Sequence, residues 1–335
     1  MTYVSFPGLG IEPFYMNRIA FSIGSIQVNW YGLIIALGMV LAVLYGMRHA
    51  KIERVKTDDV IDLALSVIIF GVIGARLYYV VMELDHYIVT GGTFWQNLGD
   101  TLYGMIAVWK GGLAIYGGII GGFIAGFFVA KKKRIRFPVI ADIAGPSVIV
   151  GQIVGRWGNF VNVEAYGRET TLPWRMGIHV SYDGGDSFLR EMFVHPTFLY
   201  ESLWNLIGLV IITLLYKKKK FHGQMFLVYI TWYGFGRMLI EGLRTDSLYV
   251  GDLRISQFVG AVSFIVGTVL LILGFRRAKA KKAEESTPVY AAAAAEYVPE
   301  TDAASDAEMD DAVPTVNTDN NGNDEWSENN DGKAD

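Results

Sequence analysis

The residues with the clearest chemical potential lie in segment 155–167, Gly-Arg-Trp-Gly-Asn-Phe-Val-Asn-Val-Glu-Ala-Tyr-Gly. An apolar run, residues 140–154, precedes it, so Arg156, two amides and Glu164 stand at the edge of an expected membrane span. Ionisable groups at that depth are costly and normally face a partner or a wet cavity. A guanidinium suits a phosphate, and glycines allow close backbone approach. The segment predicts a site for a lipid headgroup or another phosphate. The alternative is a helix-end loop with a snorkelling arginine.

The rest of the chain has the composition of a membrane protein. Of its 335 residues, 52% are hydrophobic and 38 are glycine, which transmembrane helices use for close packing. A span needs about 20 mainly apolar residues to cross ~30 Å of hydrocarbon. Seven stretches qualify: residues 23–47, 60–80, 113–130, 139–155, 197–216, 225–240 and 255–275. We therefore expect an all-α polytopic membrane protein with seven transmembrane helices.

Two features of the sequence exclude other arrangements. The chain has no cysteine, which excludes disulfides, thiolate metal sites and a cysteine nucleophile. Its first twenty residues lack a basic start, a long apolar run and a small-residue cleavage site, so no removable signal peptide is expected. Membrane insertion is therefore expected to depend on the spans themselves.

Basic clusters follow the first, third, fifth and seventh spans and hold 18 of the 29 lysines and arginines. They occupy residues 48–56, 131–136, 217–220 and 276–282. Because they alternate along the sequence of spans, they must share one membrane face. By the positive-inside rule that face is cytoplasmic, so the N-terminus is expected outside and the C-terminus inside.

Residues 1–282 are expected to form the membrane domain, with two insertions on its outer face. Residues 81–110 are mixed polar and aromatic and predict an interfacial helix or loop. Residues 157–194, with the turn-like Asp-Gly-Gly-Asp at 183–186, predict a small outer domain. Residues 283–335 hold 15 of the 33 acidic residues and only one lysine, so we expect a disordered, acidic cytoplasmic tail.

Outside the four basic clusters, nearly every basic residue is an arginine. Lys110 and Lys333 are the exceptions among eleven residues, and the others are Arg18, Arg76, Arg156, Arg168, Arg175, Arg190, Arg237, Arg244 and Arg254. Topology needs only positive charge, whereas bidentate binding of phosphate or carboxylate prefers arginine. The outer half is therefore expected to bind an anion. Codon bias would not explain the lysine-rich inner loops.

Four polar patches fall at the expected outer ends of the spans: residues 29–32, 109–122, 155–167 and 233–246. In the last patch, Arg237 and Glu241 are four residues apart and share a helix face. Glu241 either joins an ion-pair ladder with Arg244 or holds Arg237 in place for an anion. His195 precedes a proline at a helix start and is either a general base or a cap.

Together these patches resemble the prolipoprotein diacylglyceryl transferase family over residues 19–275. The pattern Gly155-Arg156-x-Gly-Asn159-Phe-x-Asn162-x-Glu164-x-x-Gly167 is similar to the signature of that family. Companion motifs match in order and spacing: Trp30-Tyr31-Gly32, Gly74-Ala75-Arg76, His195-Pro196 with Tyr200-Glu201, and Arg237 with Glu241.

The resemblance implies seven spans, an outward-facing site and a bacterial plasma membrane. It implies transfer of the diacylglyceryl group of phosphatidylglycerol to the lipobox cysteine of a preprolipoprotein, releasing glycerol phosphate. This is the first step of bacterial lipoprotein maturation. No metal, soluble cofactor or nucleic-acid partner is implied. Where many members have a histidine, this chain has Tyr116. A phenol is mostly protonated at neutral pH, so Tyr116 is expected to donate a hydrogen bond to the phosphate or to order its loop rather than act as a base.

For this reaction, Arg156 and Arg237 are the candidates to meet the charge that develops on the phosphate. Glu164 is expected to position Arg156 or to act as a base. The other candidates are assigned to binding phosphatidylglycerol: Tyr31, Asn159, Asn162, Gly167, His195, Glu241 and Arg76, the last with buried pairing as an alternative. A lipid or anion transporter is the main rival, but the polar groups gather at one face and no inverted repeats are visible. A receptor or scaffold would not need them at one depth.

Overall fold

The computed structural model describes residues 1–24, 26–181 and 190–286, and the chain divides into two units, Met1–Glu284 and Glu285–Asp335. In the described part, six helices are long and apolar enough to cross a membrane: α1 (Trp30–Ala50), α2 (Thr57–Met82), α4 (Ile115–Lys132), α5 (Phe137–Asn162), α6 (Thr197–Tyr216) and α8 (Ile255–Ser286). The chain is therefore a multi-pass membrane protein. The predicted span at residues 225–240 corresponds to α7 (Gln224–Glu241), a helix outside these six. Most of the predicted acidic tail lies outside the described residues.

Two predicted boundaries are wrong, and both matter for the site. The first span was expected from residue 23, but α1 begins at Trp30, because the antiparallel strands β3 (Ile19–Ile23) and β4 (Ile26–Asn29) precede it. The second insertion was expected from residue 157, but α5 continues to Asn162. Gly158 faces the ring of Tyr31, so α5 packs closely against α1 there. Most of the motif at 155–167 is thus helical.

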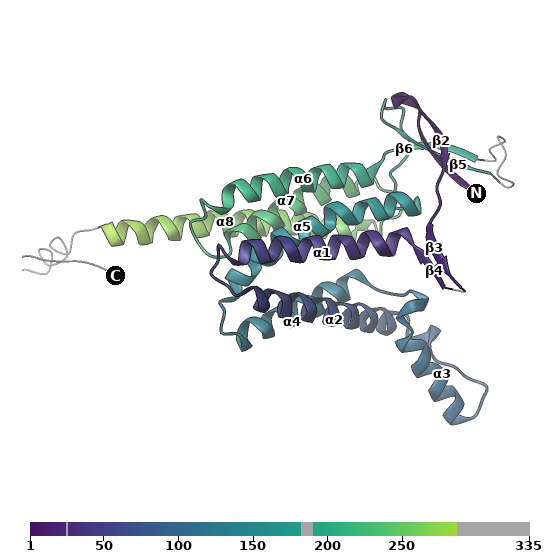
Figure 1. Cartoon of the computed structure of the whole chain (residues 1–335), viewed down its shortest axis with the longest axis horizontal. Coiled ribbons are helices and arrows are strands. Elements are labelled where there is room, and N and C mark those ends of the chain that lie inside the picture. The colour runs from purple at the N-terminus through teal and green to yellow at the C-terminus, as the bar shows by residue number, and fades with distance from the viewer. Residues whose placement is uncertain (25, 182–189, 287–335) are drawn as a thin grey trace, which may run out of the picture. The chain divides into compact units, whose positions relative to one another are not determined.

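The long helices pack as groups (Figure 1). Helix α2 packs mainly against α4, α1 against α5, and α5 against α6 and α7. Gly74 on α2 and Gly117 on α4 meet backbone to backbone, and a Cβ on either would overlap the carbonyl of the other. Small residues allow such close approach where apolar burial between helices gains little.

The lysine-rich loops gather at one end of the helices. Lys133, just after α4, lies 2.8 Å from Asp59 in the first turn of α2. Lys219, just after α6, pairs with Glu53 and lies 3.1 Å from Asp142 of α5. The Asp142 carboxylate also accepts the backbone N–H groups of residues 223, 225 and 226, so it caps the start of α7. These loops therefore meet on one side, as the charge pattern predicts.

The opposite helix ends carry strands, which the all-α prediction did not include (Figure 1). Strands β1 (Thr2–Phe6), β2 (Ile11–Tyr15), β5 (Met176–Val180) and β6 (Arg190–Val194) form an antiparallel sheet in the order β2-β1-β5-β6. The N-terminal strands thus pair with the second insertion, burying Val4, Met176, Ile178 and Val194. The first insertion contains α3 (Phe94–Ile106), and a short pair, β7 (Tyr249–Val250) and β8 (Leu253–Arg254), follows α7.

Candidate active site

A buried carboxylate, Glu201, is the centre of the polar network at this end of the helices. It lies in the second turn of α6 and is 4% exposed. Its Oε2 is 2.7 Å from Nε of Arg156, and its Oε1 is 2.7 Å from Nη1 of Arg237 and 3.6 Å from Nη1 of Arg244. One carboxylate therefore links α5, α6, α7 and the segment after α7.

The second carboxylate of the network is Glu241, at the last position of α7. Its Oε2 lies 2.7 Å from Nη2 of Arg237 and 4.0 Å from Nε of Arg244. Arg244 also donates two hydrogen bonds to Asp246, at 3.0 and 2.8 Å. Glu241 therefore approaches Arg244 and also binds Arg237, so its contacts fit both alternatives left open by the sequence. Between Glu201 and Glu241, the Arg237 guanidinium is held on two sides.

A relay of polar side chains continues from Arg156 along the end of α5. Nη1 of Arg156 donates to Oδ1 of Asn159 at 3.2 Å, and Nδ2 of Asn159 donates to Oε1 of Glu164 at 2.8 Å. Val163 and Ala165, on either side of Glu164, have φ values of 52° and 58°. A β-branched residue rarely adopts this left-handed conformation, and each such residue costs about 1–2 kcal/mol. The surrounding structure therefore holds Glu164 in place against local strain.

A cavity of about 440 Å³ opens beside Arg156, between α1 and α5. Tyr31, Gln152, Arg156 and Asn159 line its polar part, and the remaining lining is Ile35, Met39, Ala42, Val148, Gly151 and Gly155. Nη2 of Arg156 donates to no side chain or backbone group in the described residues, so it is available to a ligand. Arg237 does not line the cavity. The two arginines therefore differ: Arg156 lines the cavity, whereas Arg237 is paired with Glu201 outside the cavity lining.

A tryptophan pair sets the register between α6 and α7 next to these carboxylates. The rings of Trp204 and Trp232 stack at 4.3 Å, and each indole N–H donates to the backbone carbonyl of the other residue, at 3.0 and 2.8 Å. Gly236 leaves room for Trp204, because a Cβ there would overlap the indole. Trp204 lies one turn beyond Glu201, and Gly236 directly precedes Arg237. This clamp therefore aligns the Glu201–Arg237 ion pair.

Gly167 and His195 belong to a set of backbone hydrogen bonds that joins the loops after α5, before α6 and after α7. Gly167 N–H donates to the carbonyl of His195, and Arg168 N–H donates to that of Leu243. A Cβ at Gly167 would lie 2.7 Å from Cβ of His195. Nδ1 of His195 is 3.2 Å from the hydroxyl of Tyr200. Burial first, and then the charge of Arg168, lower the pKa of His195 below its ordinary value. The structure thus favours a neutral imidazole that holds the loop.

Three predicted site residues do not join the network. Arg76 is buried and donates only to backbone carbonyls, those of residues 104, 105, 111 and 112, so the buried-pairing alternative describes it. Tyr116, in the first turn of α4, makes no hydrogen bond to any described residue of the arginine network. Asn162 ends α5, and its side chain has no hydrogen-bond partner in the described part of the chain.

Two residues with clear places in the site were missing from the predicted set. Glu201 is the only charged residue of its apolar helix, and an isolated carboxylate in a span is a signal that sequence reasoning could have used. Gln152 has no comparable signal. Its Nε2 donates to the hydroxyl of Tyr229 at 3.1 Å, and its buried Oε1 has no hydrogen-bond partner among the described residues. Gln152 also lines the cavity, although this oxygen is itself buried.

Comparison with known proteins agrees with the motifs and the geometry. Residues 18–273 match the family model described as prolipoprotein diacylglyceryl transferase. Proteins named phosphatidylglycerol–prolipoprotein diacylglyceryl transferase are similar along most of their length. That of Listeria monocytogenes serotype 4a is 39% identical over 277 residues, which cover 81% of this chain and 93% of that protein. That of Lysinibacillus sphaericus is 42% identical over 272 residues, covering 80% and 95%. That of Finegoldia magna is 43% identical over 258 residues, covering 77% and 95%. The chain belongs to the prolipoprotein diacylglyceryl transferase family.

Proposed function

We propose that this protein transfers the diacylglyceryl group of phosphatidylglycerol to the cysteine thiol in the lipobox of a preprolipoprotein, the first step of lipoprotein maturation. Family membership and the names of the relatives support the reaction. The observation that carries the residue assignment is the cavity beside Arg156, where a guanidinium with an unengaged nitrogen meets an apolar wall. A phospholipid has this combination of an anionic head and apolar chains.

The reaction is a substitution at the glyceryl carbon attached to the phosphate. The cysteine sulfur forms a bond to that carbon, and the carbon–oxygen bond breaks. The bonding electrons stay on the phosphate oxygen, and glycerol phosphate leaves. The thiol, with an ordinary pKa near 8.5, must lose its proton. Catalysis therefore needs fixed donors for the leaving phosphate, and a positive field also favours the thiolate.

Arg156 is the proposed phosphate ligand, because it lines the cavity and keeps free donors. Arg237 is proposed to act through Glu201, since its guanidinium is already held by Glu201 and Glu241. Tyr31 and Asn159, both in the cavity wall, would orient the headgroup. Glu164 would position Arg156 through Asn159, and the relay of hydrogen bonds supports this role over that of a base.

The proposed function also requires that the site lie on the outer side of the membrane. We infer that α7 is a seventh span, because its 18 residues reach about 27 Å at 1.5 Å per residue and it packs against α5 and α6. With seven crossings, the sheet and the site face outward from a bacterial plasma membrane, the N-terminus is outside, and the basic loops are cytoplasmic. Because the chain has no cysteine, single cysteines at Thr93 and Lys218 can be tested with an impermeant maleimide on whole cells. Labelling at Lys218 but not at Thr93 would contradict this orientation.

The transfer is tested with purified protein, phosphatidylglycerol labelled in its acyl chains, and a peptide with one lipobox cysteine. Label should move to the peptide and not to its Cys→Ser control. Arg156→Lys should lose most activity although it keeps the charge, because a bidentate fork is replaced by a point charge. Binding of phosphatidylglycerol without transfer would contradict the proposed reaction. Near-normal turnover of Arg156→Lys would remove Arg156 from its proposed role.

A further inference from the structure

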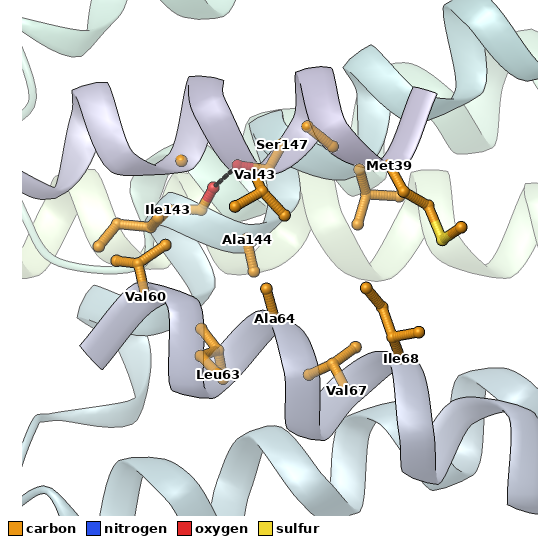
Figure 2. A pocket seen from close by; sticks show the side chains of 13 residues that line it. Met39, Val43, Val60, Leu63, Ala64, Val67, Ile68, Ile143, Ala144 and Ser147 are labelled. Atoms are coloured by element: carbon orange, nitrogen blue, oxygen red, sulfur yellow. Dashed lines mark hydrogen bonds between the residues drawn. The ribbon is translucent and has the colours of Figure 1, made fainter. Parts of the chain in front are cut away.

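A second cavity, of about 160 Å³, lies between α2 on one side and α1 with α5 on the other (Figure 2). We call it the inner cavity. Apart from Ser147, its lining is apolar: Met39, Ala42, Val43, Gly46, Val60, Leu63, Ala64, Val67, Ile68, Ile143, Ala144 and Val148. The Ser147 hydroxyl donates to the carbonyl of Ile143 at 2.8 Å, so it is already satisfied. The inner cavity therefore suits a hydrocarbon ligand.

The inner cavity adjoins the cavity beside Arg156. The two share Met39, Ala42 and Val148 in their linings. Arg156 and Ile143 are 13 residues apart on α5, a distance of about 20 Å along the helix. One leaflet contributes about half of the ~30 Å hydrocarbon thickness. The two adjacent cavities thus place an arginine at one end and an apolar lining at the other, over a length comparable to that of one leaflet.

The far end of this space is closed. Val60 and Ile143 belong to a buried cluster with Ala50, and their exposed fractions are 5%, 2% and 0%. Met47 and Val55 pack against the same cluster. An elongated ligand that entered from Arg156 would therefore meet a packed floor.

We infer that the inner cavity receives one acyl chain of the phospholipid whose phosphate lies at Arg156, and that its floor sets the longest chain that fits. This inference rests on the proposed function and adds a determinant of acyl-chain selectivity. Lipid tails are as apolar as the cavity wall, so occupancy gains little from the hydrophobic effect. Selection must come from shape, because overpacking an apolar space is penalised.

Ala64 of α2 and Ala144 of α5 point toward each other across the inner cavity, and their small side chains keep it open (Figure 2). Ala64→Leu would place three more carbons in this space. Ala36 is a matched control, because it is an exposed alanine of α1 outside both cavities. Ala36→Leu adds the same side chain facing lipid, so general effects on insertion or helix propensity are shared by the two variants.

The experiment offers each variant equal amounts of two phosphatidylglycerols, with acyl chains of about 12 and about 18 carbons, and measures both lipidated peptides by mass spectrometry. Ala64→Leu should lower the long-to-short product ratio about tenfold, within the range that overpacking produces. Ala36→Leu should leave the wild-type ratio unchanged. Equal loss of both products in Ala64→Leu, or an unchanged ratio, would overturn the inference.

A binding readout separates this inference from the proposed reaction. Phosphatidylglycerol with a photoreactive group at the end of one acyl chain is cross-linked to the wild-type protein, and the modified peptides are sequenced. Cross-links should fall in residues 60–68 and 143–148, with Ala64→Leu reducing them. Such cross-links without transfer would contradict the function and leave the acyl site standing. Transfer with cross-links confined to other helices would refute the acyl site alone.

Discussion

Replacing Glu201 by glutamine tests the central claim about the polar network. The change keeps the shape of the side chain but removes the charge that faces Arg156 and Arg237 at 2.7 Å and Arg244 at 3.6 Å. Because Glu201 is 4% exposed, water has little access to the position where its charge faces the arginines. Removing one partner of a buried ion pair costs about 3–5 kcal/mol, since the other charge is left uncompensated. We expect the free energy of unfolding to fall by this amount.

Activity should fall as well, because Glu201 holds the Nε edge of Arg156. Displacement of a positioning group by about 1 Å can cost on the order of 100-fold in rate. The free energy of unfolding is measured by SDS titration in mixed micelles, and turnover by the labelled-lipid assay. Asp246→Asn is the control: it removes a carboxylate that also binds Arg244 but is 48% exposed, and such pairs contribute only about 0–1 kcal/mol.

A double variant makes the test sharper. Glu201→Gln combined with Arg237→Gln removes both charges of one pair, so its loss of stability should be smaller than the sum of the two single losses. The reasoning would be refuted if the free energy of unfolding of Glu201→Gln lay within about 0.5 kcal/mol of the wild-type value, or if the losses of the two single variants were additive. Either result would mean that the carboxylate does not compensate the arginines.

Three further predictions concern the clamp, His195 and the tail. Gly236→Ala should lower the free energy of unfolding by about 1–3 kcal/mol, because the added Cβ overlaps Trp204. Gly99→Ala, with open space around it, should cause no such loss. Equal effects of the two changes would contradict the role of the Trp204–Trp232 pair. The pKa of His195 is lowered in the folded protein, so the unfolded chain takes up a proton on this side chain more readily. The contribution of neutral His195 to the free energy of unfolding is therefore full above about pH 6.5 and is lost as the pH falls below that value. His195→Gln should flatten the dependence of unfolding free energy on pH between about 6.5 and 5, and an unchanged slope would argue against it. Truncation after Lys282 should leave transfer intact, and loss of transfer would show that the tail is needed.

The sequence predicted most of the helices because a membrane span depends on local properties. A run of about 20 apolar residues must form a helix in lipid, where every backbone group needs an internal partner. The errors came at helix ends. The start of the first expected span belongs to the paired strands β3 and β4, and α5 runs through Gly158, where the Tyr31 ring packs against it, to Asn162. Neither event is visible in local composition.

The N-terminal strands were missed for a related reason. Strand β1 pairs with β5, about 170 residues later, and Val4 and Ile178 of these strands are buried in one cluster. The pattern of residues 1–15 alone does not show such a distant partner. Pairing of remote segments is decided by the packing of the whole unit rather than by local preference.

The sequence by itself determined the chemistry available to this protein: the motif at 155–167, arginine in place of lysine away from the basic loops, and the family to which these belong. Only the tertiary structure decided how that chemistry is distributed. It made Glu201 the shared partner of three arginines, directed Arg156 toward a cavity and Arg237 away from it, and kept Arg76 and Tyr116 out of the network. The physical reason is that charge and hydrogen-bonding capacity belong to each residue type, whereas the partners that use them come from helices far apart in the chain.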